Sequence, residues 1–199
     1  MDLDSFKNDL GSKTPEDIYN KYLIGGDVWY FRNFFGDSWF KQYDTFKLFI
    51  SNKLEVHYND IALAGSGKLG FSISPKKIFT SFNDNSDLDI IIISRKYYCI
   101  FWEAYIKDSY AEIQTNNFRK ICFSIFRRYI DFSGFSISNQ TYAEWLRKTG
   151  DFEKDLQTEF NISHKINYRI FESWDSAKLY YLNSIKKAMD IFKGLTTCE

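Results

Sequence analysis

The sequence predicts an α+β domain with a small mixed or antiparallel sheet and helices before, between and after its strands. Short aliphatic runs that predict buried strands alternate with longer segments that carry apolar residues at helical spacing. Aromatic residues make up 20% of the 199 residues, and there are only 2 prolines and 10 glycines. We therefore expect one folded domain, in which residues 1–57 form N-terminal helices and residues 58–199 form a core that ends in a helix.

Helices are expected over most of the first 57 residues. Thr14 and Pro15 are typical of a helix cap and a first helical position, and Gly25 predicts the end of that helix. From Ser38 onwards, apolar residues at helical spacing predict a longer helix that ends near His57.

Three strands are expected in the rest of the chain. Residues 60–64 form a short apolar run, and residues 88–94 contain four consecutive isoleucines. Residues 165–171 have the β-branched and aromatic content of a third strand. The remaining segments favour helices, over residues 101–129, over residues 141–160 as one or two helices, and after a cap at Ser173.

Composition excludes several functional classes. The 26 basic and 26 acidic residues give zero net charge, so a generally basic nucleic-acid-binding surface is not expected. Three cysteines are too few for a disulfide framework, and two histidines leave metal binding to carboxylates. The chain start lacks a signal-peptide pattern and no apolar run is long enough to cross a bilayer, so we expect a cytoplasmic protein without membrane insertion.

Asp87 and Asp89 are the strongest candidates for catalytic or metal-binding residues. Side chains alternate along a strand, so both aspartates are expected on one face while Leu88 and Ile90 point to the other. Two adjacent carboxylates repel each other and raise each other's pKa unless a cation neutralises them. Mg²⁺, or Mn²⁺ in its place, is the expected cofactor, because it prefers oxygen ligands and in turn attracts phosphates.

A phosphate site is expected at the end of the preceding strand. Gly65 lets the backbone approach an anion closely, and Ser66 supplies a hydroxyl and a main-chain N–H. Lys68, Lys76 and Lys77 follow in the next loop and could supply positive charge for a triphosphate. Together with the aspartates, these residues favour two-metal nucleotidyl transfer.

Ala64-Gly65-Ser66 and the later run Ser86-Asp87-Leu88-Asp89-Ile90 form one longer pattern. Over residues 61–94 it resembles the signature of the polymerase β-like nucleotidyltransferase superfamily. The resemblance implies that Asp87 and Asp89 bind Mg²⁺, that Gly65 and Ser66 hold the nucleotide's phosphates, and that residues 58–199 form a catalytic core. Small members of this kind occur in bacterial toxin-antitoxin or anti-phage systems. Twenty residues separate Ser66 from Asp87, longer than usual, which predicts a loop of unknown purpose.

The superfamily usually has a third acid on a later strand beside the first pair. If residues 165–171 run antiparallel to residues 88–94, Glu172 would lie near Asp87, which makes Glu172 our first choice. Asp131 is the alternative. Arg169, in the middle of the third strand, is expected either to pair with an acid such as Glu172 or to bind a nucleotide phosphate.

Other residues receive a structural interpretation. The basic pairs 127–128 and 186–187 are expected on solvated helix faces. Most aromatic residues are expected in the core, although Tyr97, Tyr98 or Tyr168 could stack on a base.

The function expected from the sequence is template-independent transfer of NMP or dNMP from a nucleoside triphosphate such as ATP to a hydroxyl acceptor. A short oligonucleotide signal in anti-phage defence is one product that fits. The alternative is a nucleotidyltransferase-fold antitoxin or binding module that nucleotidylates, or simply binds, a partner protein encoded nearby. Base, sugar and acceptor preference and oligomeric state do not follow from the sequence.

Overall fold

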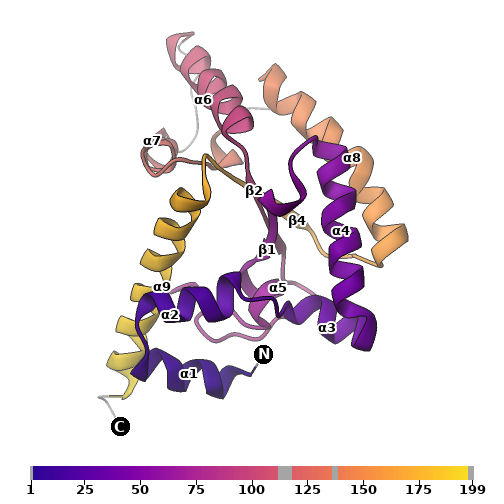
Figure 1. Ribbon diagram of the computed structural model, residues 1–199. Coiled ribbons are helices and arrows are strands. Elements are labelled where there is room, and N and C mark those ends of the chain that lie inside the picture. The colour runs from indigo at the N-terminus through magenta and orange to yellow at the C-terminus, as the bar shows by residue number, and fades with distance from the viewer. Residues whose placement is uncertain (1, 112–117, 136–138, 197–199) are drawn as a thin grey trace.

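The structure is a computed structural model that describes residues 2–111, 118–135 and 139–196. In that part of the chain, a sheet of strand order β1-β2-β4-β3 lies between two groups of helices (Figure 1). Its strands are β1 (Ile61–Ala64), β2 (Leu88–Ile93), β3 (Tyr129–Ile130) and β4 (Ile166–Phe171). The α+β class is confirmed, and β1, β2 and β4 lie where the sequence predicts strands.

The pairing of the strands differs in one respect from the expectation. β1 and β2 are antiparallel, and so are β3 and β4, but β2 and β4 are parallel. The expected antiparallel arrangement of residues 88–94 and 165–171 is therefore wrong. The long, mostly helical connection between them returns the chain to the end at which β2 starts, so both strands run in the same direction.

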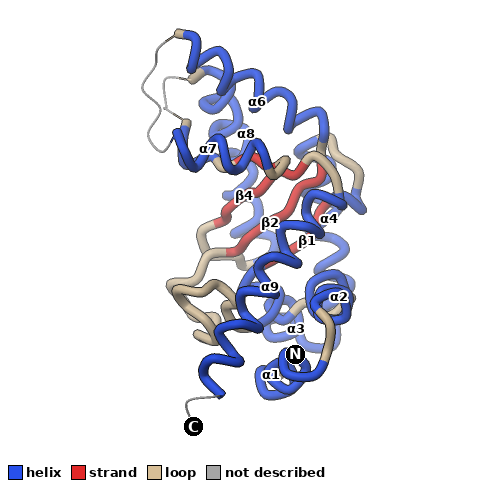
Figure 2. The backbone as a smooth tube through the Cα atoms, turned by 90° about the vertical axis from the view of Figure 1, so that its left-hand side faces the viewer, coloured by secondary structure: helices blue, strands red, loops and turns tan. Residues whose placement is uncertain are grey.

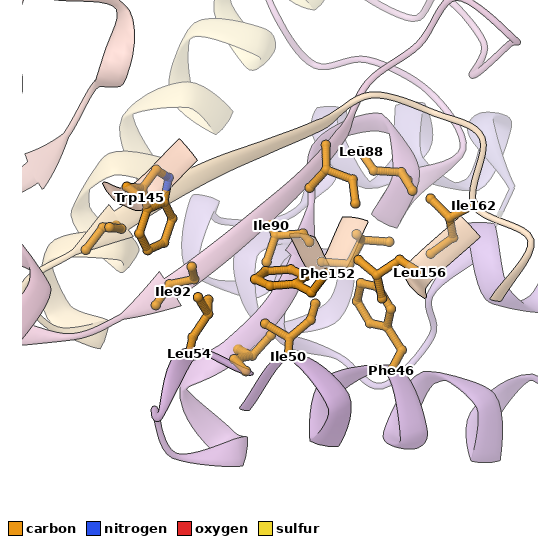
Figure 3. Packing of buried hydrophobic residues seen from close by; sticks show 14 of the residues in the cluster. Phe46, Ile50, Leu54, Leu88, Ile90, Ile92, Trp145, Phe152, Leu156 and Ile162 are labelled. Atoms are coloured by element: carbon orange, nitrogen blue, oxygen red, sulfur yellow. The ribbon is translucent and has the colours of Figure 1, made fainter. Parts of the chain in front are cut away.

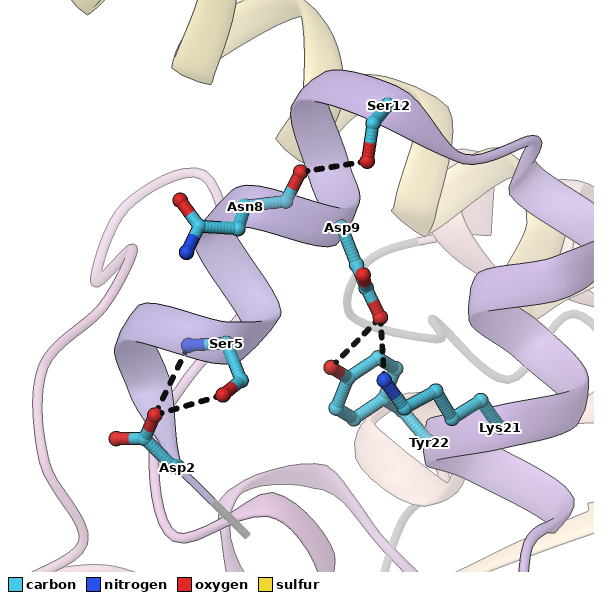
Figure 4. A network of polar contacts seen from close by, with 7 residues as sticks. All are labelled: Asp2, Ser5, Asn8, Asp9, Ser12, Lys21 and Tyr22. Carbon is cyan, nitrogen blue, oxygen red and sulfur yellow. Dashed lines mark hydrogen bonds and ion pairs between the residues drawn. The ribbon is translucent and has the colours of Figure 1, made fainter.

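Four α-helices precede the sheet, namely α1 (Leu3–Ser12), α2 (Pro15–Ile18), α3 (Trp29–Phe35) and α4 (Trp39–Leu54). Thr14 and Asp17 form a capping box at the start of α2, which continues as a π-helix over Tyr19–Ile24. Asp9 on α1 accepts hydrogen bonds from Lys21 at 2.6 Å and Tyr22 at 2.9 Å (Figure 4). This carboxylate ties α1 to the π-helix.

The later helices in the described residues are α5 (Gly65–Leu69), α6 (Arg95–Tyr110), α7 (Phe118–Phe126), α8 (Gln140–Phe160) and α9 (Trp174–Thr196). The sequence predicts one helix over residues 101–129, whereas the structure has α6, α7 and the short strand β3. Residues 112–117 of that expected helix lie outside the described residues. α8 is a single helix that continues through Gly150.

One face of the sheet carries most of the core. Ile90 and Ile92 of β2 pack with Phe46 and Ile50 of α4 and with Phe152 of α8, all of them fully buried (Figure 3). Because side chains alternate along β2, every second residue of the isoleucine run contributes to this cluster.

The opposite face is apolar over only part of its length. Ile91, Ile93 and Phe171 pack with α9 and the N-terminal helices in a second cluster. Figure 2 shows α9 crossing in front of the strands on this side. Where β2 begins, the same face carries Asp89 instead of an aliphatic residue. Among the described residues, no helix is long and apolar enough to cross a membrane.

Candidate functional site

A cleft of about 820 Å³ lies at the start of β2, on the face that α9 covers. Asp87 and Asp89 line it together with Gly65 and Ser66 at the start of α5. Its other walls come from the loop between α5 and β2, from β4 and from α9. The structure therefore brings the four central residues of the sequence motif into one cavity.

Gly65 lies directly against Asp89. The register pairs Ala64 with Asp89, and Gly65 follows with a φ of +60°. A Cβ atom at Gly65 would lie 2.3 Å from Oδ2 of Asp89 and 3.2 Å from Cγ. Only glycine combines this backbone conformation with the approach of a carboxylate, which explains the residue type at this bend.

The two aspartates differ in environment. Asp89 is half-buried, whereas Asp87 is exposed. Burial raises the pKa of Asp89 above its ordinary value, and the charge of Asp87 adds to this effect, while Arg169 and a hydrogen bond from Asn167 oppose it. The two carboxylates therefore repel each other, and a cation between them would relieve that repulsion.

Arg169 extends from β4 into the same cleft. Its guanidinium lies 5.0 Å from the centre of the Tyr180 ring and donates a hydrogen bond to the Tyr181 hydroxyl. Burial alone would lower the pKa of Arg169, but Tyr181, Tyr180 and Asp89 outweigh burial and raise it. The acid beside Arg169 is thus Asp89 and not Glu172.

Glu172 lies at the wrong end of the sheet to join the aspartates. Because β2 and β4 are parallel, Leu88 pairs with Ile166, and the residue after β4 lies at the opposite end from Asp87. The Glu172 carboxylate contacts two arginines, Arg95 at 3.7 Å and Arg128 at 3.5 Å. The choice of Glu172 as the third acid depended on antiparallel strands, and the structure does not support it.

Asp131, the alternative third acid, is also engaged elsewhere. It follows β3, accepts a hydrogen bond from the Ser133 backbone at 2.9 Å and forms an ion pair with Lys120 at 2.9 Å. It does not line the cleft in the described part of the chain.

Asn167 is the residue that lies beside Asp89 on β4. It pairs with Asp89 across the parallel β2 and β4 strands, so both side chains lie on the same face, and its amide donates a hydrogen bond to the Asp89 carboxylate. An amide oxygen is an accepted ligand of hard cations but carries no charge. The sequence analysis missed Asn167 because the parallel register was not known.

Lys68 lies outside the cleft, contrary to the expectation that it binds the nucleotide. It is 4% exposed, and its ammonium donates a hydrogen bond to the Gly25 carbonyl oxygen in a second cavity of about 490 Å³. Burial lowers the pKa of Lys68 to about 8, against the opposing attraction of Asp27. The expected turn after Gly65 is the helix α5, in which residues two apart point in nearly opposite directions, so Ser66 and Lys68 diverge.

Other basic residues line the cleft in its place. Lys77 comes from the loop between α5 and β2, Arg127 follows α7, and Lys187 lies on α9. The sequence analysis placed residues 127 and 187 on solvated helix faces, since no local pattern marks them. Their place beside the aspartates is a consequence of the tertiary fold.

The aromatic residues of the cleft also differ from those considered in the sequence. Tyr129, Tyr180 and Tyr181 line it. Tyr97 and Tyr98 instead donate hydrogen bonds to backbone carbonyl oxygens, those of Leu54 and Ile125. Tyr168 packs against Trp145 and Phe152 in the core on the other face.

The donor set fits a cation that shares its coordination with a phosphate ligand. In the described residues, no group of three or more His, Cys, Asp or Glu side chains is arranged to hold a metal alone. Mg²⁺ commonly uses one or two carboxylates and completes its shell with water and substrate phosphates. Asp87, Asp89 and the amide of Asn167 match that pattern better than they match a closed metal site.

Comparison with family models, curated proteins and solved structures finds no match to this chain.

We expect Gly65→Ala to lower the free energy of unfolding by about 1–3 kcal/mol, because its Cβ would meet Asp89 at a positive φ. Gly150→Ala is the matched control. Gly150 lies inside α8 with no atom near a new Cβ, so the same substitution should stabilise by about 0.5–1 kcal/mol. Urea unfolding measures both, and equal effects would contradict the close approach at Gly65.

The lowered pKa of Lys68 predicts a pH-dependent stability. Between about pH 8 and its ordinary pKa of 10.5, Lys68 is neutral in the folded chain and protonated in the unfolded chain, so stability rises with pH. We expect the free energy of unfolding of the wild type, relative to Lys68→Met, to increase by about 2–3 kcal/mol from pH 7 to pH 10. If urea unfolding instead shows the same pH dependence of the free energy of unfolding for the wild type and Lys68→Met, the folded chain does not lower the pKa of Lys68.

Proposed function

We propose that this chain is a Mg²⁺-dependent, template-independent nucleotidyltransferase of the polymerase β-like type. It would transfer NMP or dNMP from a nucleoside triphosphate to a hydroxyl acceptor. The observation that supports this most is the contact of Asp89 with the bend at Gly65, inside a cleft of about 820 Å³ that Asp87 also lines. Such a volume is typical of small-molecule sites.

The charges around the pair suit a triphosphate. Besides the two aspartates, the charged residues that line the cleft in the described chain are all basic, namely Lys77, Arg127, Arg169 and Lys187. A cleft of this composition attracts a polyanion although the whole chain has zero net charge. The binding energy would come from charge-assisted hydrogen bonds to phosphate oxygens.

The loop between α5 and β2 adds neutral donors. Ser72, Ser74, Thr80 and Ser81 line the cleft, and the loop is held in shape by backbone hydrogen bonds between Ser72 and Thr80 and between Phe82 and Gly70. Hydroxyl groups in a fixed loop suit the phosphates or the ribose of a nucleotide. In this proposal, the long loop before Asp87 contributes to nucleotide binding.

In the proposed reaction, the acceptor's hydroxyl oxygen forms a bond to the α-phosphorus, the bond from that phosphorus to the bridging oxygen breaks, pyrophosphate leaves, and the hydroxyl proton passes to solvent. Bound Mg²⁺ would polarise the phosphoryl group and neutralise the developing charge. Asp87 and Asp89 would be the ligands of that cation. Arg169 fixes Asp89 from the side of β4, and Lys77 and Lys187 offer charge to the departing pyrophosphate.

The test is pyrophosphate release by the purified chain with each NTP and dNTP, in Mg²⁺ or Mn²⁺. We expect Asp87→Asn and Asp89→Asn to reduce release more than about 100-fold, because losing even an outer partner of a metal ligand costs 10–100-fold. Asp151→Asn, which removes an exposed carboxylate on α8, should have no effect. Equal activity in all three variants would refute the proposed site.

A second candidate function is nucleotide binding without transfer. Asn167 favours it, because an uncharged amide occupies the place beside Asp89 where an acid would complete the site. This module could act as an antitoxin-like partner of a protein encoded nearby. After incubation with NTP and this chain, the partner protein should gain the mass of a nucleotide if the chain nucleotidylates the partner. Its mass should stay unchanged if the chain only binds.

Asn167→Asp separates the two candidates. If transfer is the function and the amide limits the metal site, the added carboxylate should increase pyrophosphate release at least about tenfold. Mg²⁺ should also raise the melting temperature of this variant more than that of the wild type, since a third anion needs the cation. Nucleotide binding without release in either protein would favour the binding module.

A further inference from the structure

Two exposed residues of α7 and the residue that follows it form a short ladder of two arginines and one aromatic ring. Arg119 and Phe123 lie four residues apart on α7, and Arg127 follows the helix, with its backbone N–H donating to the Phe123 carbonyl oxygen. The guanidinium of Arg119 lies 5.9 Å from the centre of the Phe123 ring, and that of Arg127 lies 5.6 Å from it. We call these three residues the α7 ladder.

The α7 ladder leads into the cleft. Arg127 at its end is a lining residue of the cleft, together with Tyr129 and Lys187. Arg127 is eight positions after Arg119, so the ladder is about 12 Å long at a helical rise of 1.5 Å per residue. Figures 1 and 2 both place α7 near the N-terminal end of α9, the helix that forms one wall of the cleft.

The ladder arginines are available to a ligand. Two neighbouring basic residues are neutralised, Lys120 by Asp131 at 2.9 Å and Arg128 by Glu172 at 3.5 Å. In the part of the chain that the structure describes, neither Arg119 nor Arg127 has an acidic partner, and both are exposed. Phe126 beside them is 86% exposed. The surface thus offers fixed positive charge next to aromatic surface.

We infer that the α7 ladder binds the single-stranded end of an oligonucleotide and directs its 3′-hydroxyl into the cleft. Its role as an acceptor site rests on the proposed function, whereas binding itself does not. Phosphates would pair with the arginines, and bases would stack on the guanidinium planes and on Phe126. In the transfer step the 3′-oxygen bonds to the α-phosphorus, pyrophosphate leaves, and the hydroxyl proton passes to solvent.

Charge favours a nucleic acid over a protein partner. The ladder continues into a cleft whose basic lining residues outnumber its two acids, so a polyanion would meet positive charge along the whole path. A length of about 12 Å spans more than one phosphate group, which suits a chain of nucleotides and exceeds the needs of one free nucleotide.

The binding test uses fluorescein-labelled 12-nucleotide single-stranded RNA and DNA of the same sequence, with full-length protein and no NTP. We expect fluorescence anisotropy to show binding of at least one of them that weakens with salt. Arg119→Glu and Phe123→Ala should each weaken it at least about tenfold. Arg147→Glu on α8 makes the same charge change at an exposed residue outside the cleft lining and should not.

Three results would overturn the inference: no binding of either oligonucleotide, equal losses in Arg119→Glu and Arg147→Glu, or competition by a polyglutamate peptide of equal charge as strong as that by unlabelled oligonucleotide. The last result would indicate an acidic protein partner. Failure of the proposed function gives a different result, in which the oligonucleotide binds through the ladder but no pyrophosphate is released. If transfer occurs, Arg119→Glu should raise the KM for the oligonucleotide and leave kcat unchanged.

Discussion

The contact between Gly65 and the Asp89 carboxylate is the constraint on which the rest of the site depends. It fixes where β1 must end and α5 must begin, because only a residue without Cβ can turn there at a φ of +60°. Two residues later, Gly67 also leaves no room for a Cβ, which would lie 2.6 Å from a methyl group of Leu88. Two glycines thus let a helix start against the first residues of β2.

The charges near Asp89 explain how the fold tolerates that carboxylate without a bound cation. Arg169 provides partial neutralisation, and it is itself held by the Tyr180 ring and the Tyr181 hydroxyl. A guanidinium with these partners stays charged, so it balances one of the two aspartates but not both. In the function that we propose, a divalent cation that arrives with phosphates would relieve the remaining repulsion.

Local sequence patterns were enough for β1, β2 and β4 and for the central motif, but not for the short strand β3 or for the division of residues 101–129 into separate elements. Alternation within the isoleucine run placed Asp89 on the correct face, and the Gly-Ser bend lies beside it. The sequences of the strands do not show whether they pair in parallel or antiparallel, because aliphatic content is the same in both. The wrong expectation of antiparallel strands pointed to Glu172, whereas the parallel register places Asn167 beside Asp89. Lys68 was misplaced for a local reason, since a five-residue helix after a glycine bend looks like a turn in sequence.

The location of the cleft follows from the same alternation that builds the core. On one face β2 presents Leu88, Ile90 and Ile92, and helices cover it without interruption. On the other face Asp89 precedes Ile91 and Ile93, so an apolar helix can pack over the second half only. α9 therefore presents Tyr180, Tyr181 and Lys187 where it passes the charged half, and space remains between helix and sheet. A single acidic residue at the start of a hydrophobic strand thus decides both where the core ends and where the cleft begins.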